Sequence, residues 1–250
     1  MTTEPTSQGS DAAAPLDPPD HPELVVFDCD GVLVDSEVLV VDVEARMLTE
    51  AGFPITADEI ADHFIGLSYG SMMAELARRH GRAVPDDLSE RIQQAAIDRF
   101  PDHLRPVPGM PALLAGSERP RCVASSSDLD RIALSLQLTG LDVHFAADRV
   151  FSAQMVERGK PAPDLFLLAA ETLDVETAAC LVVEDSTAGV VAARAAGMDV
   201  VGLVAGGHAR PNLGDRLTEA GARRVFTTVE ELAGHLDSGT GSGSPHLDGP

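Results

Sequence analysis

Tryptophan is absent from this sequence, tyrosine and lysine each occur once, and cysteine occurs three times. So few aromatic rings argue against a stacking surface for bases or sugars. Three cysteines without a ligand spacing indicate neither a disulfide framework nor a zinc site, and we expect a reducing, cytoplasmic location. No apolar run approaches the roughly 18 residues of a membrane span. The first twenty residues contain acids but no Lys or Arg, so we expect no signal peptide.

Positive charge is also scarce. The 18 Lys and Arg oppose 40 Asp and Glu, which gives a formal net charge of −22. Binding to nucleic acid or to an anionic membrane depends on cations that meet phosphates, so we expect neither partner.

Hydrophobic residues make up 44% of the chain, enough for a sizeable core. We expect a monomer, with a weak dimer as the alternative.

Short apolar runs alternate with helical patterns along most of the chain, which is typical of the parallel strands of βαβ units. The strand-like runs cover 24–27, 122–124, 150–151, 180–183 and 200–204. Helical patterns cover about 110–116, 128–139, 163–173, 187–196 and 211–221. The sequence therefore predicts an α/β fold, with a Rossmann-like three-layer core around a parallel sheet.

Residues 36–105 interrupt this alternation. They contain only helical patterns, over 38–50, 57–64, 71–80 and 88–100, and Thr56 with Glu59 fits a capping box. We expect an inserted α-helical cap, hinged near 35–36 and 105–108, over a catalytic core made of residues 22–35 and 106–236. Residues 1–21 and 237–250 have the composition of disordered tails.

Acids and hydroxyls follow several of the predicted strands: Asp28 and Asp30, then Ser125 and Ser126, then Glu184 and Asp185. Ligands bind at the carboxyl ends of the strands in open parallel sheets, so these side chains are expected at one edge. Lys160, the single lysine, follows the third run and can reach that edge. Grouped carboxylates favour Mg²⁺, and a metal beside a Lys and a Ser can hold a phosphoryl group. One of the two first acids can act as nucleophile while the other moves a proton.

The segment FDCDGVLVDSE resembles the DxDGxLxDS signature of the haloacid dehalogenase-like superfamily. The resemblance covers residues 23–236, where the motifs Asp28/Asp30, Ser125, Lys160 and Glu184-Asp185 follow in family order. It implies that Asp28 forms an aspartyl-phosphate and that Asp30 is the general acid and base. It also implies that Mg²⁺ is held by the Asp28 carboxylate, the Asp30 backbone carbonyl and Asp185, with Glu184 beside it. The phosphoryl oxygens would be held by Ser125, Ser126 and Lys160.

Departures from related patterns narrow the predicted activity. Asp30 argues against the dehalogenases and phosphonoacetaldehyde hydrolases of this superfamily. Its β-phosphoglucomutases carry a His twelve residues beyond the nucleophile, where this chain has Val40, and cationic cap residues, whereas residues 37–77 contain only Arg46. The sequence thus predicts a Mg²⁺-dependent phosphatase of a small phosphorylated metabolite, a sugar phosphate or a sugar-acid phosphate such as 6-phosphogluconate. The alternatives are a β-phosphoglucomutase-like mutase and a non-catalytic protein that binds a phosphometabolite.

Three further positions are candidates with a structural alternative. Ser68 and Tyr69 lie in a Gly-flanked loop of the cap, where they either contact substrate or form an ordinary turn. His208 follows the last predicted strand and is either a substrate contact or a surface loop residue.

Overall fold

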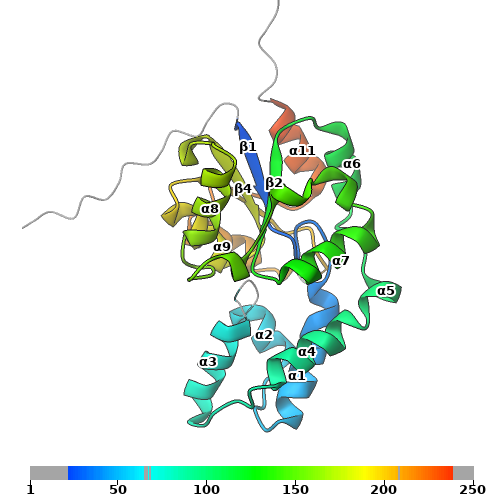
Figure 1. Ribbon diagram of the computed structural model, residues 1–250, viewed down its shortest axis with the longest axis vertical. Helices are drawn as coiled ribbons and strands as arrows, with labels where there is room; N and C mark the ends of the chain where they lie inside the picture. The colour runs from blue at the N-terminus through cyan, green and yellow to red at the C-terminus, as the bar shows by residue number, and fades with distance from the viewer. Residues whose placement is uncertain (1–21, 65–66, 68, 208, 239–250) are drawn as a thin grey trace, which may run out of the picture.

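A computed structural model describes residues 22–64, 67, 69–207 and 209–238 (Figure 1). The expected N-terminal tail, most of the expected C-terminal tail, Ser68 and His208 lie outside the described residues. The core is a six-stranded parallel sheet of order β3-β2-β1-β4-β5-β6. Its strands are β1 (Leu24–Phe27), β2 (Arg121–Ser125), β3 (Val150–Ser152), β4 (Cys180–Glu184), β5 (Asp199–Leu203) and β6 (Arg224–Phe226).

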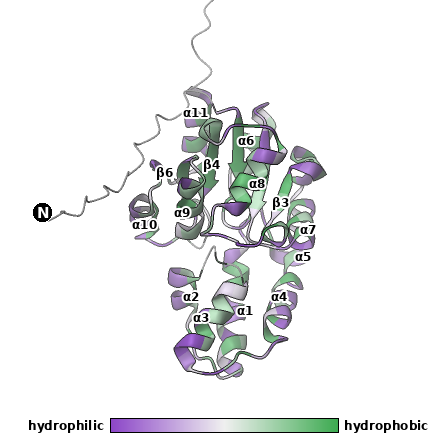
Figure 2. Ribbon diagram, turned by 60° about the vertical axis from the view of Figure 1, so that its left-hand side comes forward, coloured by the Kyte–Doolittle hydropathy of each residue, from purple (hydrophilic) through white to green (hydrophobic). Residues whose placement is uncertain are grey.

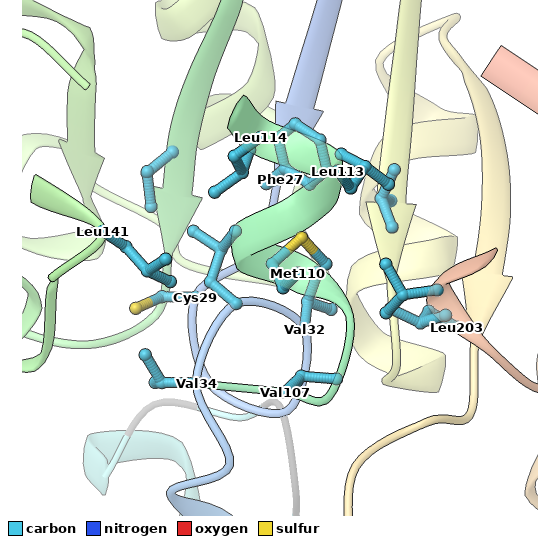
Figure 3. Close-up of a cluster of buried hydrophobic side chains, with 14 of the residues drawn as sticks. Phe27, Cys29, Val32, Val34, Val107, Met110, Leu113, Leu114, Leu141 and Leu203 are labelled. Atoms are coloured by element: carbon cyan, nitrogen blue, oxygen red, sulfur yellow. The ribbon is translucent and has the colours of Figure 1, made fainter. Parts of the chain in front are cut away.

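Helices cover both faces of the sheet, because successive apolar side chains of each strand point to opposite sides. In β1, Val25 and Phe27 join one buried cluster, and Leu24 and Val26 join the other. The first cluster (Figure 3) includes side chains of α6 (Met110–Gly116), α7 (Leu129–Thr139) and α11 (Val229–Ser238). The second includes side chains of α8 (Asp164–Thr172), α9 (Thr187–Ala195) and α10 (Leu213–Ala220). The predicted α/β fold with a three-layer core is confirmed.

A group of helices lies below the carboxyl ends of the strands (Figures 1 and 2). It comprises α1 (Glu37–Glu50), α2 (Ala57–His63), α3 (Tyr69–His80), α4 (Leu88–Ile97) and α5 (Phe100–His103). Its apolar side chains, such as Leu48, Phe53 and Ile92, form a buried cluster of their own. We call these helices the cap helices; the domain boundaries at 36 and 105 stay a prediction.

The two connections between core and cap helices run side by side. Asp35 N donates to Arg105 O at 2.9 Å, and Val107 N donates to Leu33 O at 3.0 Å. Asp35 Oδ1 also accepts a hydrogen bond from Gly207 N at 2.9 Å. These bonds place the predicted hinge beside the loop that follows β5.

Some elements differ from the sequence prediction. The strand β6 and the helix α11 were not predicted, and α11 continues to Ser238, two residues into the expected tail, because Leu236 packs in the core. The predicted helix over 88–100 is two helices, and Pro101 stands in the first turn of the second, α5, where its missing N–H costs no helical hydrogen bond. The capping box at Thr56 is confirmed. Short 3₁₀ helices cover Asp142–His144, Ala147–Arg149, Ala153–Met155 and Thr177–Ala179.

Every helix in the described part of the chain is too short or too polar to cross a membrane.

Candidate active site

Lys160 lies at the centre of a buried charge cluster at the carboxyl ends of β1, β2 and β4. Its Nζ donates to Asp28 Oδ1 at 2.8 Å, to Glu184 Oε1 at 2.6 Å and to the backbone oxygen of Ala124 at 2.9 Å. Only 1% of the lysine side chain is exposed. Three acceptors thus satisfy the three donors of the ammonium group.

Glu184 is fixed by the start of α9. Its Oε2 accepts hydrogen bonds from the backbone nitrogens of Asp185 and Ser186, both at 3.1 Å, and from the Ser186 hydroxyl at 2.9 Å. Ser186 also caps α9 by accepting from Gly189 N. A Cβ at Gly189 would lie 1.8 Å from Glu184 Oε1, so the carboxylate needs a glycine in this turn.

Asp30 has a different set of partners. Its Oδ2 accepts from Ser127 Oγ at 2.6 Å, and its Oδ1 accepts from Arg131 Nη2 at 2.8 Å and from Ser36 Oγ. Ser36 precedes α1, so one carboxylate oxygen joins the hinge to α7 of the core. Arg131 had no place in the sequence prediction, whereas Ser127 directly follows Ser125 and Ser126 in the hydroxyl cluster predicted after the second strand. The one available signal was an arginine beside Ile132 on the face that α7 buries.

The two aspartates of the first motif have opposite pKa shifts. Burial raises the pKa of Asp28 well above its usual value, and the charges of Glu184 and Asp185 add to this, although Lys160 opposes it. Burial would also raise the pKa of Asp30, but the Arg131 charge and the hydrogen bonds from Ser127 and Ser36 lower it below its usual value. Different neighbours therefore give the two carboxyls different protonation behaviour. The directions are the reverse of those expected for an ionised nucleophile at Asp28 and a protonated acid at Asp30, and a divalent cation held beside Asp28 would lower the pKa of that carboxyl.

The residues present fit a hard divalent cation. Carboxylate oxygens of Asp28, Glu184 and Asp185 all lie within 4.8 Å of one another, and all three residues are buried. Three carboxylates against one lysine leave an excess of two negative charges, and oxygen donors are the ligands that Mg²⁺ prefers. The Asp30 side chain lies outside this group, so its predicted metal contact would use the backbone carbonyl alone.

A cavity of about 360 Å³ opens onto this cluster, between the sheet edge and the cap helices. Asp28, Asp30 and Asp185 line it. The predicted phosphate-binding Ser125 and Ser126 and the predicted substrate contact Tyr69 also line it. Lys160 lies behind Asp28, where it contacts the carboxylate and stays out of the cavity wall. The structure thus brings together the described candidates from four motifs that span 28 to 185.

The sheet is doubly wound and parallel, and its carboxyl edge carries grouped carboxylates, a buried lysine and serine hydroxyls. This combination is typical of enzymes that transfer phosphoryl groups. Residues 25–203 match the family model described as haloacid dehalogenase-like hydrolase, so the chain belongs to this family. The resemblance seen in the sequence is confirmed.

Known proteins agree with this assignment. The 6-phosphogluconate phosphatase of Escherichia coli is 31% identical over 211 residues, which cover 84% of this chain and 92% of that protein. A haloacid dehalogenase-like protein of unknown function from Agrobacterium tumefaciens has a TM-score of 0.75 and 35% identity, covering 86% of this chain and 98% of that one. A protein described as a β-phosphoglucomutase from Bacteroides vulgatus has a TM-score of 0.74 and 25% identity, covering 88% and 89%. The chain is a phosphatase of the haloacid dehalogenase-like type that acts on a phosphorylated metabolite.

Proposed function

We propose that this chain is a Mg²⁺-dependent phosphatase of a sugar phosphate or sugar-acid phosphate, working through an aspartyl-phosphate on Asp28. The observation that carries the proposal is the buried group of Asp28, Lys160, Glu184 and Asp185 beneath one cavity. We place the reaction in the cytoplasm, on a monomer or a weak dimer.

Asp28 is the proposed nucleophile. Its ion pair with Lys160 uses Oδ1, which leaves Oδ2 to attack phosphorus. Burial of both groups fixes the carboxylate, so the attack needs little reorganisation. Ser125 and Ser126 would hold the phosphoryl oxygens, and Lys160 would join them by exchanging one of its three present acceptors for a phosphoryl oxygen. The Lys160 charge also opposes the rise in the pKa of Asp28.

Asp30 is the proposed general acid and base. It lines the same cavity, where it would protonate the leaving oxygen and then take a proton from the attacking water. In the structure its carboxylate accepts hydrogen bonds from Ser36, Ser127 and Arg131, so a turn of the side chain toward the substrate must release at least one of them. Because Ser36 precedes α1, movement of the cap helices would assist that release.

Mg²⁺ would be held by Asp28, Asp185 and the backbone carbonyl of Asp30, with Glu184 beside it, and it would neutralise phosphoryl charge. The chain's own contribution is to position these oxygens. Glu184 does so through Ser186 and the start of α9.

Two observations speak against the alternatives. Val40 lines the cavity where the resemblance places a histidine in the mutases, and no Lys or Arg of the described cap residues lines it. A non-catalytic binding protein would not need both Asp28 and Asp30 in the cavity wall. Phosphatase chemistry therefore has the better support.

The test is release of inorganic phosphate from a panel of sugar phosphates, in Mg²⁺ and in EDTA. Release should require Mg²⁺, and Asp28→Asn should abolish it because the substitution removes the nucleophile's charge at constant shape. Asp42→Asn is the matched control, since this exposed aspartate lies on α1. Release that is independent of metal, or undiminished in Asp28→Asn, would contradict the proposal.

A further inference from the structure

One side of the cavity is lined by acidic side chains of α1, and we call it the acidic wall. The leaving group of the substrate would lie against this wall. Glu37 and Glu44 of α1 line the cavity together with polar, uncharged side chains of the other cap helices, Tyr69, Ser89 and Gln93. Among the described lining residues, the cap helices supply no Lys or Arg. Asp28 and Ser125 of the core, where we propose that the phosphoryl group binds, line the same cavity.

Arg131 is the single Lys or Arg among the described residues that line this cavity. Its Nη2 donates to Asp30 at 2.8 Å and only 7% of its side chain is exposed, while its Nε is buried with no hydrogen-bond partner among the described residues. Its guanidinium also lies 5.6 Å from the centre of the Phe100 ring. A substrate anion that binds the Arg131 guanidinium would share it with Asp30, whose charge already offsets that of Arg131.

The charges around Arg131 are unbalanced. Asp30, Glu37 and Glu44 face a single guanidinium, and Asp128 also lines the cavity. Glu44 is buried, and burial raises its pKa, opposed by the nearby Tyr69 hydroxyl and the Arg131 charge. Protonated or not, Glu44 offers a sugar hydroxyl or an ammonium group a partner, and it offers a carboxylate no positive charge.

We propose that this chain selects monophosphates whose leaving group is a polyol, uncharged or bearing an amine, and rejects those with a carboxylate or a second phosphate. The inference rests on the phosphatase activity proposed above, and it separates the two substrate classes named there. Like charges in a partly desolvated cavity repel strongly enough to reduce kcat/KM about tenfold or more.

Three substrates of one shape test the charge preference directly. Glucitol 6-phosphate, 6-phosphogluconate and 1-amino-1-deoxyglucitol 6-phosphate share an open six-carbon chain, and carbon 1 carries a hydroxymethyl, a carboxylate or an aminomethyl group. We expect kcat/KM for the amine and the alcohol to exceed that for the carboxylate by about tenfold or more. Equal values, or a preference for the carboxylate, would overturn the inference.

The double substitution Glu37→Gln and Glu44→Gln tests whether these two side chains cause the preference for uncharged or amine-bearing leaving groups. It should reduce the ratio of kcat/KM between amine and carboxylate about tenfold, while Glu50→Gln, on the exposed side of the same helix, leaves the ratio unchanged. Because kcat/KM for the amine and for the carboxylate is measured on one preparation, a loss of folded protein affects both values equally and leaves their ratio unchanged. An unchanged ratio in the double variant would overturn the inference.

Failure of this inference differs from failure of the proposed function. Hydrolysis of p-nitrophenyl phosphate needs no charge match at the leaving group. Turnover of p-nitrophenyl phosphate with the carboxylate preferred among the three sugars overturns the charge selection alone. No phosphate release from any of the four compounds overturns the proposed function and the charge selection with it.

Discussion

Replacing Lys160 with methionine removes the cation that two buried carboxylates share. The lysine contacts Asp28 at 2.8 Å and Glu184 at 2.6 Å, and both acids are nearly inaccessible to water. Removing one partner of a buried ion pair costs about 3–5 kcal/mol, because the remaining charge stays uncompensated. We expect Lys160→Met to lower the free energy of unfolding by this amount at pH 7, measured by urea denaturation in EDTA.

The loss should depend on pH. Burial raises the pKa of Asp28, and Lys160 is the group that opposes the rise, so the variant's folded state binds a proton more readily than its unfolded state. Stability from such a carboxyl grows as the pH falls. The difference between wild type and Lys160→Met should therefore be smaller at pH 5 than at pH 7.

Two further variants complete this test. Glu184→Gln in the Lys160→Met background removes one of the stranded charges and should recover part of the loss. Arg46→Met is the control, because this exposed residue pairs with Glu50 at 3.5 Å and should change stability by less than about 0.5 kcal/mol. A loss below about 1 kcal/mol in Lys160→Met, or the same loss at both pH values, would refute the reasoning.

Two other predictions concern packing. Gly189→Ala should cost about 1–3 kcal/mol and lower phosphate release, because the added methyl overlaps the Glu184 carboxylate. Gly234→Ala, where no atom lies within 4 Å of an added Cβ, should instead gain about 0.5–1 kcal/mol; equal stabilities in urea would contradict this. All three cysteines are buried with raised thiol pKa values, so we expect no reaction of the native protein with Ellman's reagent and three thiols after denaturation. Rapid labelling before unfolding would show that the core is more open than described.

Most of the sheet could be predicted because its strands are buried on both faces. The runs that became β1 and β4 are apolar throughout, so composition alone marks them. The strand β6 has only three residues and begins with the exposed Arg224, which hides it from the same pattern. In α11, Glu230, Glu231 and His235 dilute the apolar positions, and only packing against α6 and β6 shows that the helix belongs to the core.

Some residues of the site could be predicted from the sequence, and others are revealed only by the packing of the helices. Asp28 and Asp185 directly follow strands, Glu184 is the last residue of β4, and Lys160 lies in the loop after β3. The sheet topology alone therefore predicts that the four side chains meet. Arg131 could not be predicted as a partner of Asp30, because it reaches Asp30 only through the packing of α7, whereas Ser127 lies in the hydroxyl cluster that follows β2. The acidic wall depends on which side of α1 faces the cavity, and the sequence around Glu37 and Glu44 does not state this.

The central claim is that Asp28 carries the phosphoryl group during the reaction. We would mix the enzyme with Mg²⁺ and a sugar phosphate that it hydrolyses, and quench the reaction with acid during turnover. Peptide mass spectrometry would then locate the phosphoryl group on the chain. The account predicts one phosphoryl group on the peptide that contains Asp28, and none in Asp28→Asn. Steady release of phosphate with no phosphoryl group trapped on Asp28, and with full activity in Asp28→Asn, would contradict the claim that Asp28 carries the phosphoryl group.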